Sequence, residues 1–237
     1  MNFLKLIAII FFNLVDKYIH QKRILYFLKK NKVSINSVID VGAHKGVYTD
    51  FLLDNFKIKK AFLFEPQKKV YRHIKKKYKN TPGVKTFNSA ASNKNTSKRI
   101  YINKHDLTSS LTKMNTKNIY LNLKARLFGG NIHDMVTESY NVKSLKLSDF
   151  IKTKNIMSLD LIKIDTEGHE LSVLEGLEGK IKLVKIILIE FHTNKIYINY
   201  DNIKIHRYLT TNNFILQKKI KFPFTEWEDR IYFNKNY

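Results

Sequence analysis

The stretch "LDLIKIDTEGHELSVLEGL" (residues 159–177) passes from an apolar run through a charged turn into a second apolar pattern. The first run is mostly apolar, as in a central strand of a parallel sheet that is covered on both faces. After the turn, apolar residues recur at helical spacing: Leu171, Val173, Leu174 and Leu177. A buried strand that leads directly into an amphipathic helix predicts a right-handed βαβ unit and a parallel sheet.

The same alternation of strand and helix extends along most of the chain. Further strands are predicted at 37–41, 60–65, 84–90, 99–103, 185–191, 214–218 and 230–235. Further helices are predicted at 47–56, 68–80 and 202–212. No linker rich in Gly, Ser or Pro interrupts residues 36–237, so we expect one α/β domain there. Residues 104–140 break the alternation, and we predict a substrate-facing insertion, with an irregular surface excursion as the alternative.

The first 35 residues are expected to form an N-terminal helical extension. Their most apolar stretch, Leu6–Phe12, is far shorter than the roughly 20 residues that span a bilayer. No small-residue cleavage site follows it, which argues against a secretory signal. Two interpretations stay open for residues 1–30. The helix either packs on the domain or lies on a membrane face beside Lys17, Lys22 and Arg23, as a peripheral contact.

The composition excludes several kinds of chemistry. The chain has 237 residues, 43% of them hydrophobic, and no cysteine, so disulfides, zinc–thiolate sites and thiol nucleophiles are absent. This fits a cytoplasmic protein. The net charge of +23 attracts anions, but lysines scattered over nearly every segment supply most of it. Such scattering favours solvated faces over a dedicated nucleic-acid surface.

A glycine turn and an acidic strand end together indicate a nucleoside cofactor. In "DVGAHKG" (residues 40–46), Gly42 and Gly46 permit a sharp turn after a strand. The spacing matches neither the GxGxxG fingerprint nor a Walker A motif. Glu65 ends the next strand 23 residues beyond Gly42, at a position where a carboxylate accepts hydrogen bonds from ribose hydroxyls. Without glycines that cradle a pyrophosphate, S-adenosylmethionine suits this turn better than NAD does.

These motifs resemble those of the FkbM-type methyltransferases. The resemblance rests on "VIDVGAHKGVYT" (38–49), "FLFEP" (62–66), "SSL" (109–111), "LSDF" (147–150) and "IKIDTEGHELSVLEG" (162–176). It implies a Rossmann-like class I methyltransferase fold with a mostly parallel seven-stranded sheet and helices on both faces. It also implies that S-adenosylmethionine is the cofactor and that the acceptor is a hydroxyl of a sugar, glycan or other small molecule.

The resemblance assigns the cofactor-binding residues. The methionine part would be surrounded by Asp40, Gly42, Ala43 and Gly46. The ribose would be held by Glu65. In such folds the adenine lies near the end of the third strand, which makes Asn88, Ser89 and Ala90 candidates for contacting it.

The catalytic candidates follow from two strand ends. Asp165 and Glu167 follow one strand, and Glu190 and His192 close its neighbour, so these groups and His169 should meet at one rim. Two mechanisms for removing the acceptor proton stay open. Either His169 or His192 acts as a general base oriented by a carboxylate, or Asp165 and Glu190 hold a divalent cation, with His192 as a further ligand.

Some residues near this rim have structural interpretations. Asp165 or Thr166 would cap the following helix, and Glu170 would complement its dipole. Gly168 would supply a backbone conformation that other residues resist. A buried Lys163 would need an acidic partner.

Two competing functions remain. An RNA methyltransferase is favoured only by the basic charge; the chain has no Pro-Pro motif of the amino-methylating enzymes and no cysteine for C5 methylation. A non-catalytic binding module with the cofactor fold is disfavoured by the presence of Glu65, Asp165 and Glu167.

Overall fold

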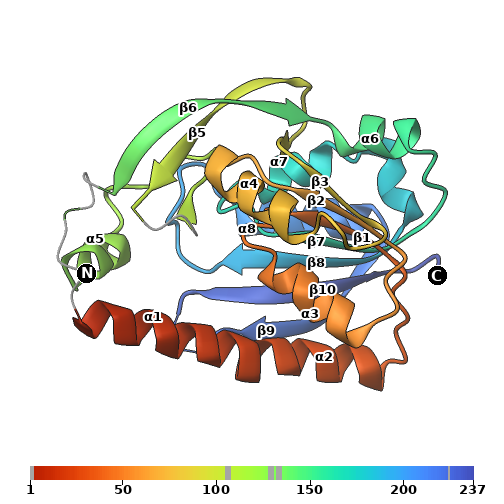
Figure 1. Cartoon of the computed structure of the whole chain (residues 1–237), viewed down its shortest axis with the longest axis horizontal. Helices are drawn as coiled ribbons and strands as arrows, with labels where there is room; N and C mark the ends of the chain where they lie inside the picture. The colour runs from red at the N-terminus through yellow and green to blue at the C-terminus, as the bar shows by residue number, and fades with distance from the viewer. Residues whose placement is uncertain (1–2, 105–107, 128–130, 132–134, 224) are drawn as a thin grey trace.

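The computed structural model describes residues 3–104, 108–127, 131, 135–223 and 225–237, and its centre is a seven-stranded sheet (Figure 1). The strands are β1 Ser37–Val41, β2 Lys60–Phe64, β3 Val84–Phe87, β7 Leu159–Ile164, β8 Val184–His192, β9 Phe214–Lys221 and β10 Trp227–Asn234. Their order is β3-β2-β1-β7-β8-β10-β9. The first five in this order pair in parallel, and β10 is antiparallel to both of its neighbours. The predicted mostly parallel sheet is confirmed.

Helices cover both faces of this sheet. They are α2 Gln21–Lys30, α3 Val47–Asn55, α4 Lys68–Lys77, α6 Leu147–Thr153, α7 Glu170–Glu175 and α8 Asn202–Thr211, with a 3-10 turn at Glu178–Leu183. Successive side chains of a strand point to opposite faces. Ile39 and Val41 of β1 accordingly pack in the core under α6, α7 and α8. Val38 packs in the core under α2 and α3.

A second, smaller sheet lies beside the first (Figure 1). It consists of β4 Ala90–Ala91, β5 Thr96–Asn103 and β6 Val136–Leu145. Strand β6, which pairs antiparallel with β5, was not predicted because most of its side chains are exposed or half-buried and no apolar run marks it. The predicted strand 84–90 is instead two strands, β3 and β4, separated by Asn88 and Ser89.

The predicted insertion 104–140 is the connection from β5 to β6, and its last residues, 136–140, belong to β6 itself. Within this connection, helix α5 spans Ile119–Leu127. Residues 105–107, 128–130 and 132–134 of the predicted insertion lie outside the described residues.

The predicted N-terminal helical extension is one helical run. It comprises α1 Phe3–Val15, a π-helical turn η1 Asp16–His20, and α2. Ile24 and Leu28 of α2 pack against the sheet, and the imidazole Nε2 of His20 lies 2.8 Å from the Asp229 carboxylate on β10. Among the described residues, no helix is long and apolar enough to cross a bilayer.

Candidate active site

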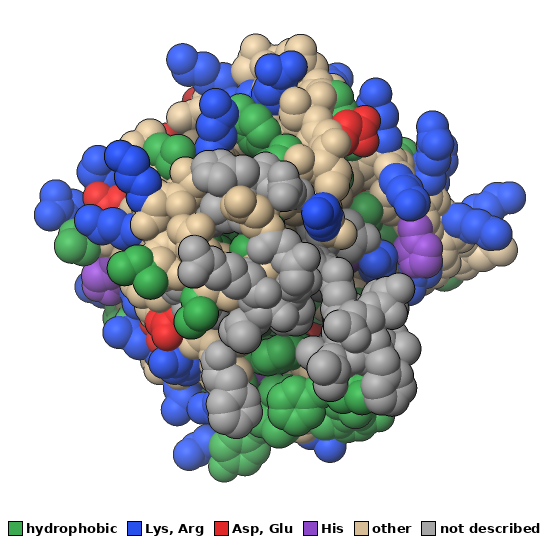
Figure 2. Space-filling view, turned by 90° about the vertical axis from the view of Figure 1, so that its left-hand side faces the viewer, with side chains coloured by type: hydrophobic (Ala, Val, Ile, Leu, Met, Phe, Trp, Pro, Cys, Tyr) green, Lys and Arg blue, Asp and Glu red, His purple; other side chains and the backbone are tan. Residues whose placement is uncertain are grey.

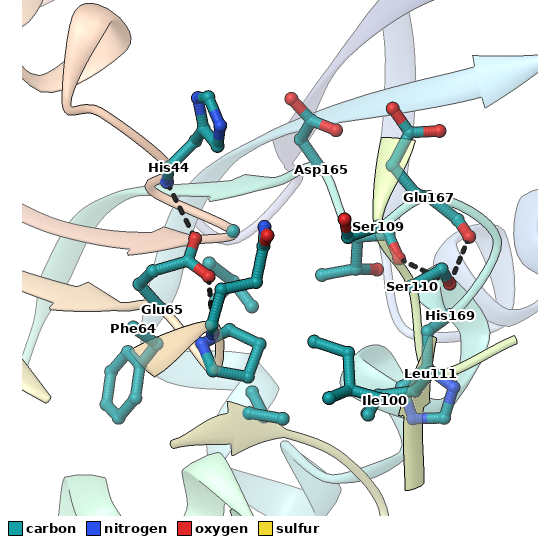
Figure 3. A pocket seen from close by; sticks show the side chains of 17 residues that line it. His44, Phe64, Glu65, Ile100, Ser109, Ser110, Leu111, Asp165, Glu167 and His169 are labelled. Atoms are coloured by element: carbon teal, nitrogen blue, oxygen red, sulfur yellow. Dashed lines mark hydrogen bonds between the residues drawn. The ribbon is translucent and has the colours of Figure 1, made fainter. Parts of the chain in front are cut away.

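A cleft opens beyond the carboxyl ends of β1, β2 and β7. Six of the predicted site residues line it: Gly42, Glu65, Ala90, Asp165, Glu167 and His169. Figure 3 shows Glu65 and Phe64 on one side of the cleft, with Ser110 and Glu167 across from them. The position agrees with the rule that ligands of open α/β sheets bind outside the carboxyl ends of the strands.

The Glu65 carboxylate is fixed in the wall of this cleft. One oxygen accepts the backbone N–H of His44 at 2.9 Å, and the other accepts that of Gln67 at 2.7 Å (Figure 3). The side chain is only 2% exposed, and burial raises the pKa of Glu65 to about 7. Each oxygen has a second lone pair, so the carboxylate can still accept two hydroxyl groups from a ligand.

The glycine turn is required by contacts within the protein. Gly42 has φ +80°, and a Cβ there would lie 1.8 Å from the Asp165 carbonyl oxygen. Gly46 has φ +75°, and its Cβ would lie 2.3 Å from the Tyr78 hydroxyl. We predicted that these glycines permit a sharp turn after the strand, and the structure adds a packing reason for them. Of the residues in this turn assigned to the methionine part, Gly42 lines the cleft, whereas Ala43 and Gly46 are not among the lining residues.

Asp40 lies fully buried beneath this turn. Its Oδ2 accepts a hydrogen bond from Thr49 Oγ1 at 2.7 Å, while Oδ1 has no hydrogen-bond partner among the described residues. Burial raises the pKa of Asp40. Since buried polar atoms are normally satisfied, the orphaned oxygen fits a site where a ligand or an ordered water supplies the donor.

The three adenine candidates lie in different surroundings. Asn88 uses its side-chain amide to donate to the backbone oxygens of Glu65 and Pro66, at 2.9 and 3.1 Å, and thereby braces the strand end. Ser89 is buried, and Ala90 lines the cleft. Four further residues of the apolar wall were not among the predicted site residues: Phe64, Ala91, Ile100 and Leu111.

At the rim, Asp165 is held by the buried Lys163. Lys163 Nζ donates to Asp165 Oδ2 at 2.7 Å and lies 5.2 Å from the centre of the Tyr48 ring. Burial alone would lower the pKa of Lys163, but the charges of Asp165 and Asp40 outweigh it and raise that pKa. The predicted ion pair is confirmed, and it fixes one oxygen of the Asp165 carboxylate.

Behind the rim, Glu167, Glu190 and His192 form a compact cluster. His192 Nε2 lies 3.3 Å from Glu190 Oε1 and 3.7 Å from Glu167 Oε2, and the Tyr197 hydroxyl also donates to Glu167 Oε2. Burial, followed by the charges of Asp165 and Glu167, raises the pKa of Glu190 well above its usual range. Glu167 lines the cleft, whereas His192 is 2% exposed and lies behind it.

This cluster differs from the predicted metal pair. The ligand atoms of Glu167, Glu190 and His192 all lie within 4.8 Å of one another, and Asp165 is not part of the group. Two carboxylates and an imidazole form a donor set that Mg²⁺ or Mn²⁺ accepts. The structure therefore groups Glu190 with Glu167, while Asp165 is paired with Lys163.

His169 lies apart from the carboxylates. Its Nε2 is 2.9 Å from the Ser92 hydroxyl, and burial together with the charge of Lys98 lowers the pKa of His169 to about 4. A general base works best with a pKa near the operating pH. Of the two histidines that we considered, only His192 has carboxylate neighbours that could orient it.

The side chain of Glu170, at the start of α7, holds the loop between β7 and α7. Glu170 Oε1 accepts the backbone N–H groups of Thr166 and Gly168 at 3.0 and 3.1 Å. The prediction of Asp165 or Thr166 as N-cap is wrong, because His169 occupies that position and makes no side-chain cap. The prediction for Gly168 is confirmed: it has φ +92°, and a Cβ there would lie 2.4 Å from the ring of Tyr197.

The start of the β5–β6 connection packs over this loop. Ser110 Oγ donates to the Glu167 carbonyl at 2.5 Å, and Thr112 Oγ1 donates to that of Gly168 at 3.0 Å. Ser109, Ser110 and Leu111 line the cleft. The connection that we predicted to face the substrate thus covers one side of the site.

A family model described as "Methyltransferase FkbM domain" matches residues 40–216, which include every residue of this site. Hexuronic acid methyltransferase AglP of Haloferax volcanii is 30% identical over 61 residues, or 25% of this chain and 26% of that protein. The chain therefore matches about a quarter of the length of this curated relative.

Solved structures with similar folds include three methyltransferases. Methyltransferase FkbM of Methylobacillus flagellatus KT has a TM-score of 0.55 at 14% identity, covering 84% of this chain and 43% of its own. Magnesium protoporphyrin IX methyltransferase of Synechocystis PCC 6803, with bound S-adenosylmethionine, has a TM-score of 0.52 at 11% identity, covering 99% and 85%. M. capricolum TrmK, in complex with S-adenosylhomocysteine, has a TM-score of 0.52 at 13% identity, covering 92% and 68%. These similarities confirm the Rossmann-like class I methyltransferase fold.

Proposed function

This chain belongs to the FkbM methyltransferase domain family, and we propose that it transfers a methyl group from S-adenosylmethionine to a hydroxyl of a sugar, glycan or other small molecule. The observation that carries this proposal is a single cleft lined by the buried carboxylate of Glu65 on one side and by Asp165 and Glu167 at the rim. The first group suits a ribose, and the other two suit an acceptor that must lose a proton.

The residues of the cleft fit the cofactor. Glu65 is positioned to accept both ribose hydroxyls, and the apolar wall of Phe64, Ile100 and Leu111 provides a surface for the adenine. The turn at Gly42, with the orphaned oxygen of Asp40 beneath it, is the proposed place of the methionine part. S-adenosylmethionine supplies an electrophilic methyl group when bound.

The acidic rim would prepare the acceptor. We assign the role of proton acceptor to Glu167, which lines the cleft, and a supporting role to Asp165, fixed by Lys163. His192 lies behind the cleft lining, with its Nε2 3.7 Å from Glu167 Oε2, so we assign it the role of a positioning residue that orients this carboxylate. An acceptor oxygen held in line with the methyl carbon completes the geometry that such a displacement needs.

The acceptor class can be tested directly. Purified chain and methyl-labelled S-adenosylmethionine are incubated with hexuronic acids, oligosaccharides that contain them, nucleotide sugars and RNA. Hexuronic acids come first because of the name of the curated relative. We expect label in a base-stable methyl ether on a sugar. A base-labile methyl ester would instead identify a carboxylate acceptor, and transfer to RNA alone would refute the proposal.

Variants link the transfer to the rim. Glu167→Gln should lower kcat by about 100-fold or more, the usual contribution of a positioned general base, while S-adenosylhomocysteine binds as before. Glu175→Gln, an exposed glutamate on α7, serves as the matched control. Full activity of Glu167→Gln would exclude the proposed proton acceptor without excluding the methyltransferase.

A further inference from the structure

One face of the N-terminal helical run carries a row of apolar side chains that no other part of the described protein covers. About half of each side chain is exposed: Ile7 47%, Ile10 49%, Phe11 48%, Leu14 50% and Tyr18 52%. Spacings of three and four residues place them on a single stripe of the helix. We call this stripe the apolar face of α1–η1.

Other positions of the same run hold it to the domain. Val15 and His20 are buried, the Phe12 ring lies 6.2 Å from that of Phe222, and His20 pairs with Asp229. The orientation of the helix is therefore fixed, and the apolar face is kept turned outward. Single exposed apolar residues are common, whereas a contiguous row of this kind marks an interaction surface.

The helix also projects where a planar partner could reach it. In Figure 1, α1 runs past the edge of the seven-stranded sheet, toward the same end of the molecule as the arrowhead of β8. In Figure 2, which views that end, hydrophobic side chains gather along the lower edge, with lysine or arginine side chains around them.

The charges around the apolar face favour an anionic partner. Helix α1 contains no acidic residue. The amino groups of Lys17 and Lys22 lie 5.5 and 5.6 Å from the centre of the Tyr18 ring, and Asp16 accepts a hydrogen bond from Gln21. A tyrosine flanked by lysines is typical of the boundary between acyl chains and headgroups, where lysine stems lie along apolar surface and their charges reach water.

We propose that the apolar face of α1–η1 docks on an anionic lipid surface, with the helix in the plane of the headgroups and Lys17 and Lys22 against acidic lipids. A second copy of the chain fits this face less well, because two chains of net charge +23 repel each other. The apolar row supplies the insertion, and the lysines supply the preference for negative charge.

Vesicle co-sedimentation tests this proposal with the full chain. Vesicles of phosphatidylcholine alone are compared with vesicles that also contain phosphatidylglycerol. We expect binding to the mixed vesicles that weakens as salt is raised. The double variant Phe11→Ser, Leu14→Ser should reduce it about tenfold or more, because two half-exposed apolar side chains can no longer insert. The control is Met157→Ser, Ile203→Ser, which removes apolar side chains that are 80% and 70% exposed elsewhere.

Three outcomes would overturn the proposal. One is no binding to the mixed vesicles. Another is binding that the Phe11/Leu14 variant retains in full, which would assign it to scattered lysines alone. The third is a dimer in sedimentation velocity that this variant dissociates without lipid, which would assign the face to a second copy. Thermal unfolding of both double variants is measured alongside, and we expect both to remain folded, since none of the substituted positions is buried.

Discussion

The titration of Glu65 gives the sharpest test of the cofactor site. The folded carboxyl has a pKa of about 7, raised by burial. Ribose hydroxyls donate hydrogen bonds, so the form that binds best is the ionised carboxylate, which predominates above that pH. The proposed assignment therefore predicts that affinity for S-adenosylhomocysteine rises as the pH rises through 7.

The size of this effect follows from the ionised fraction. With a pKa of about 7, roughly one-tenth of the carboxyl is ionised at pH 6 and roughly nine-tenths at pH 8. An apparent Kd scales inversely with the competent fraction, so it should fall about tenfold over this range. Calorimetry in buffers of different ionisation enthalpy should also detect release of nearly one proton per ligand at pH 6 and almost none at pH 8.

The variant Glu65→Gln isolates the group responsible. It keeps the shape of the side chain and one acceptor oxygen, which can serve the backbone N–H of either His44 or Gln67, so it disturbs the wall less than alanine would. Loss of a hydrogen bond to a charged group costs about 1.5–3 kcal/mol, so binding at pH 8 should weaken roughly tenfold to a hundredfold and lose its pH dependence. Glu138→Gln, at an exposed position on β6, is the control.

The reasoning fails if the wild-type Kd is flat between pH 6 and 8, or if Glu65→Gln keeps the same slope. The second result would point to another group in the same range. Glu170 is a candidate for that group, because burial also raises the pKa of its carboxyl to about 7.

Three further predictions concern the loop after β7 and the cluster behind it. Gly168→Ala should destabilise the protein by about 1–3 kcal/mol in urea unfolding, because of its positive φ and the Tyr197 ring; Gly179→Ala, with no atom near its Cβ, should change little. Burial raises the pKa of Glu170 from 4.5 to about 7 in the folded protein, so its contribution to the free energy of unfolding falls by about 3 kcal/mol as the pH rises between these values. In Glu170→Gln, the free energy of unfolding should therefore decrease less between pH 5 and 7.5 than in the wild type. EDTA should leave the rate of methyl transfer unchanged if Glu167 acts as a base, and a loss that Mg²⁺ restores would make the cluster a metal centre.

The fold could be predicted where burial leaves a continuous signature. Strands β7 and β8 are buried along nearly their whole length, so they appear as apolar runs that few other structures produce. Strand β6 has only Val142 and Ser144 buried, and its antiparallel partner lies far away in the sequence. Its pairing with β5 is a tertiary contact, which no local sequence pattern predicts.

The site was predictable to the level of the strand ends and no further. The topology brings Asp165, Glu167, Glu190 and His192 to one edge, as the sequence order of strands implies. Which carboxylate pairs with which cation depends on the directions of side chains, which spacing does not specify. In the structure, Asp165 pairs with Lys163, whereas Glu190 groups with Glu167 and His192. The two residues of the predicted metal pair, Asp165 and Glu190, thus belong to different clusters. Ile100 lines the cleft from the second sheet; its segment was predicted to be a strand, but no motif in it pointed to the site.

The loop that carries Asp165 and Glu167 is held in a conformation that the chain alone disfavours. Glu167 has φ +55°, although it is not a glycine, and such a backbone costs on the order of 1 kcal/mol or more. Glu170 is fully buried and has one oxygen without a hydrogen-bond partner among the described residues. Hydrogen bonds to the loop offset these costs. Glu170 accepts from backbone N–H groups of the loop, and Ser110 and Tyr197 donate to the carbonyl and the carboxylate of Glu167. A loop that serves only to join a strand to a helix needs none of them. Restraint from three separate segments is what a site needs when two carboxylates must hold their positions beside a reacting methyl group.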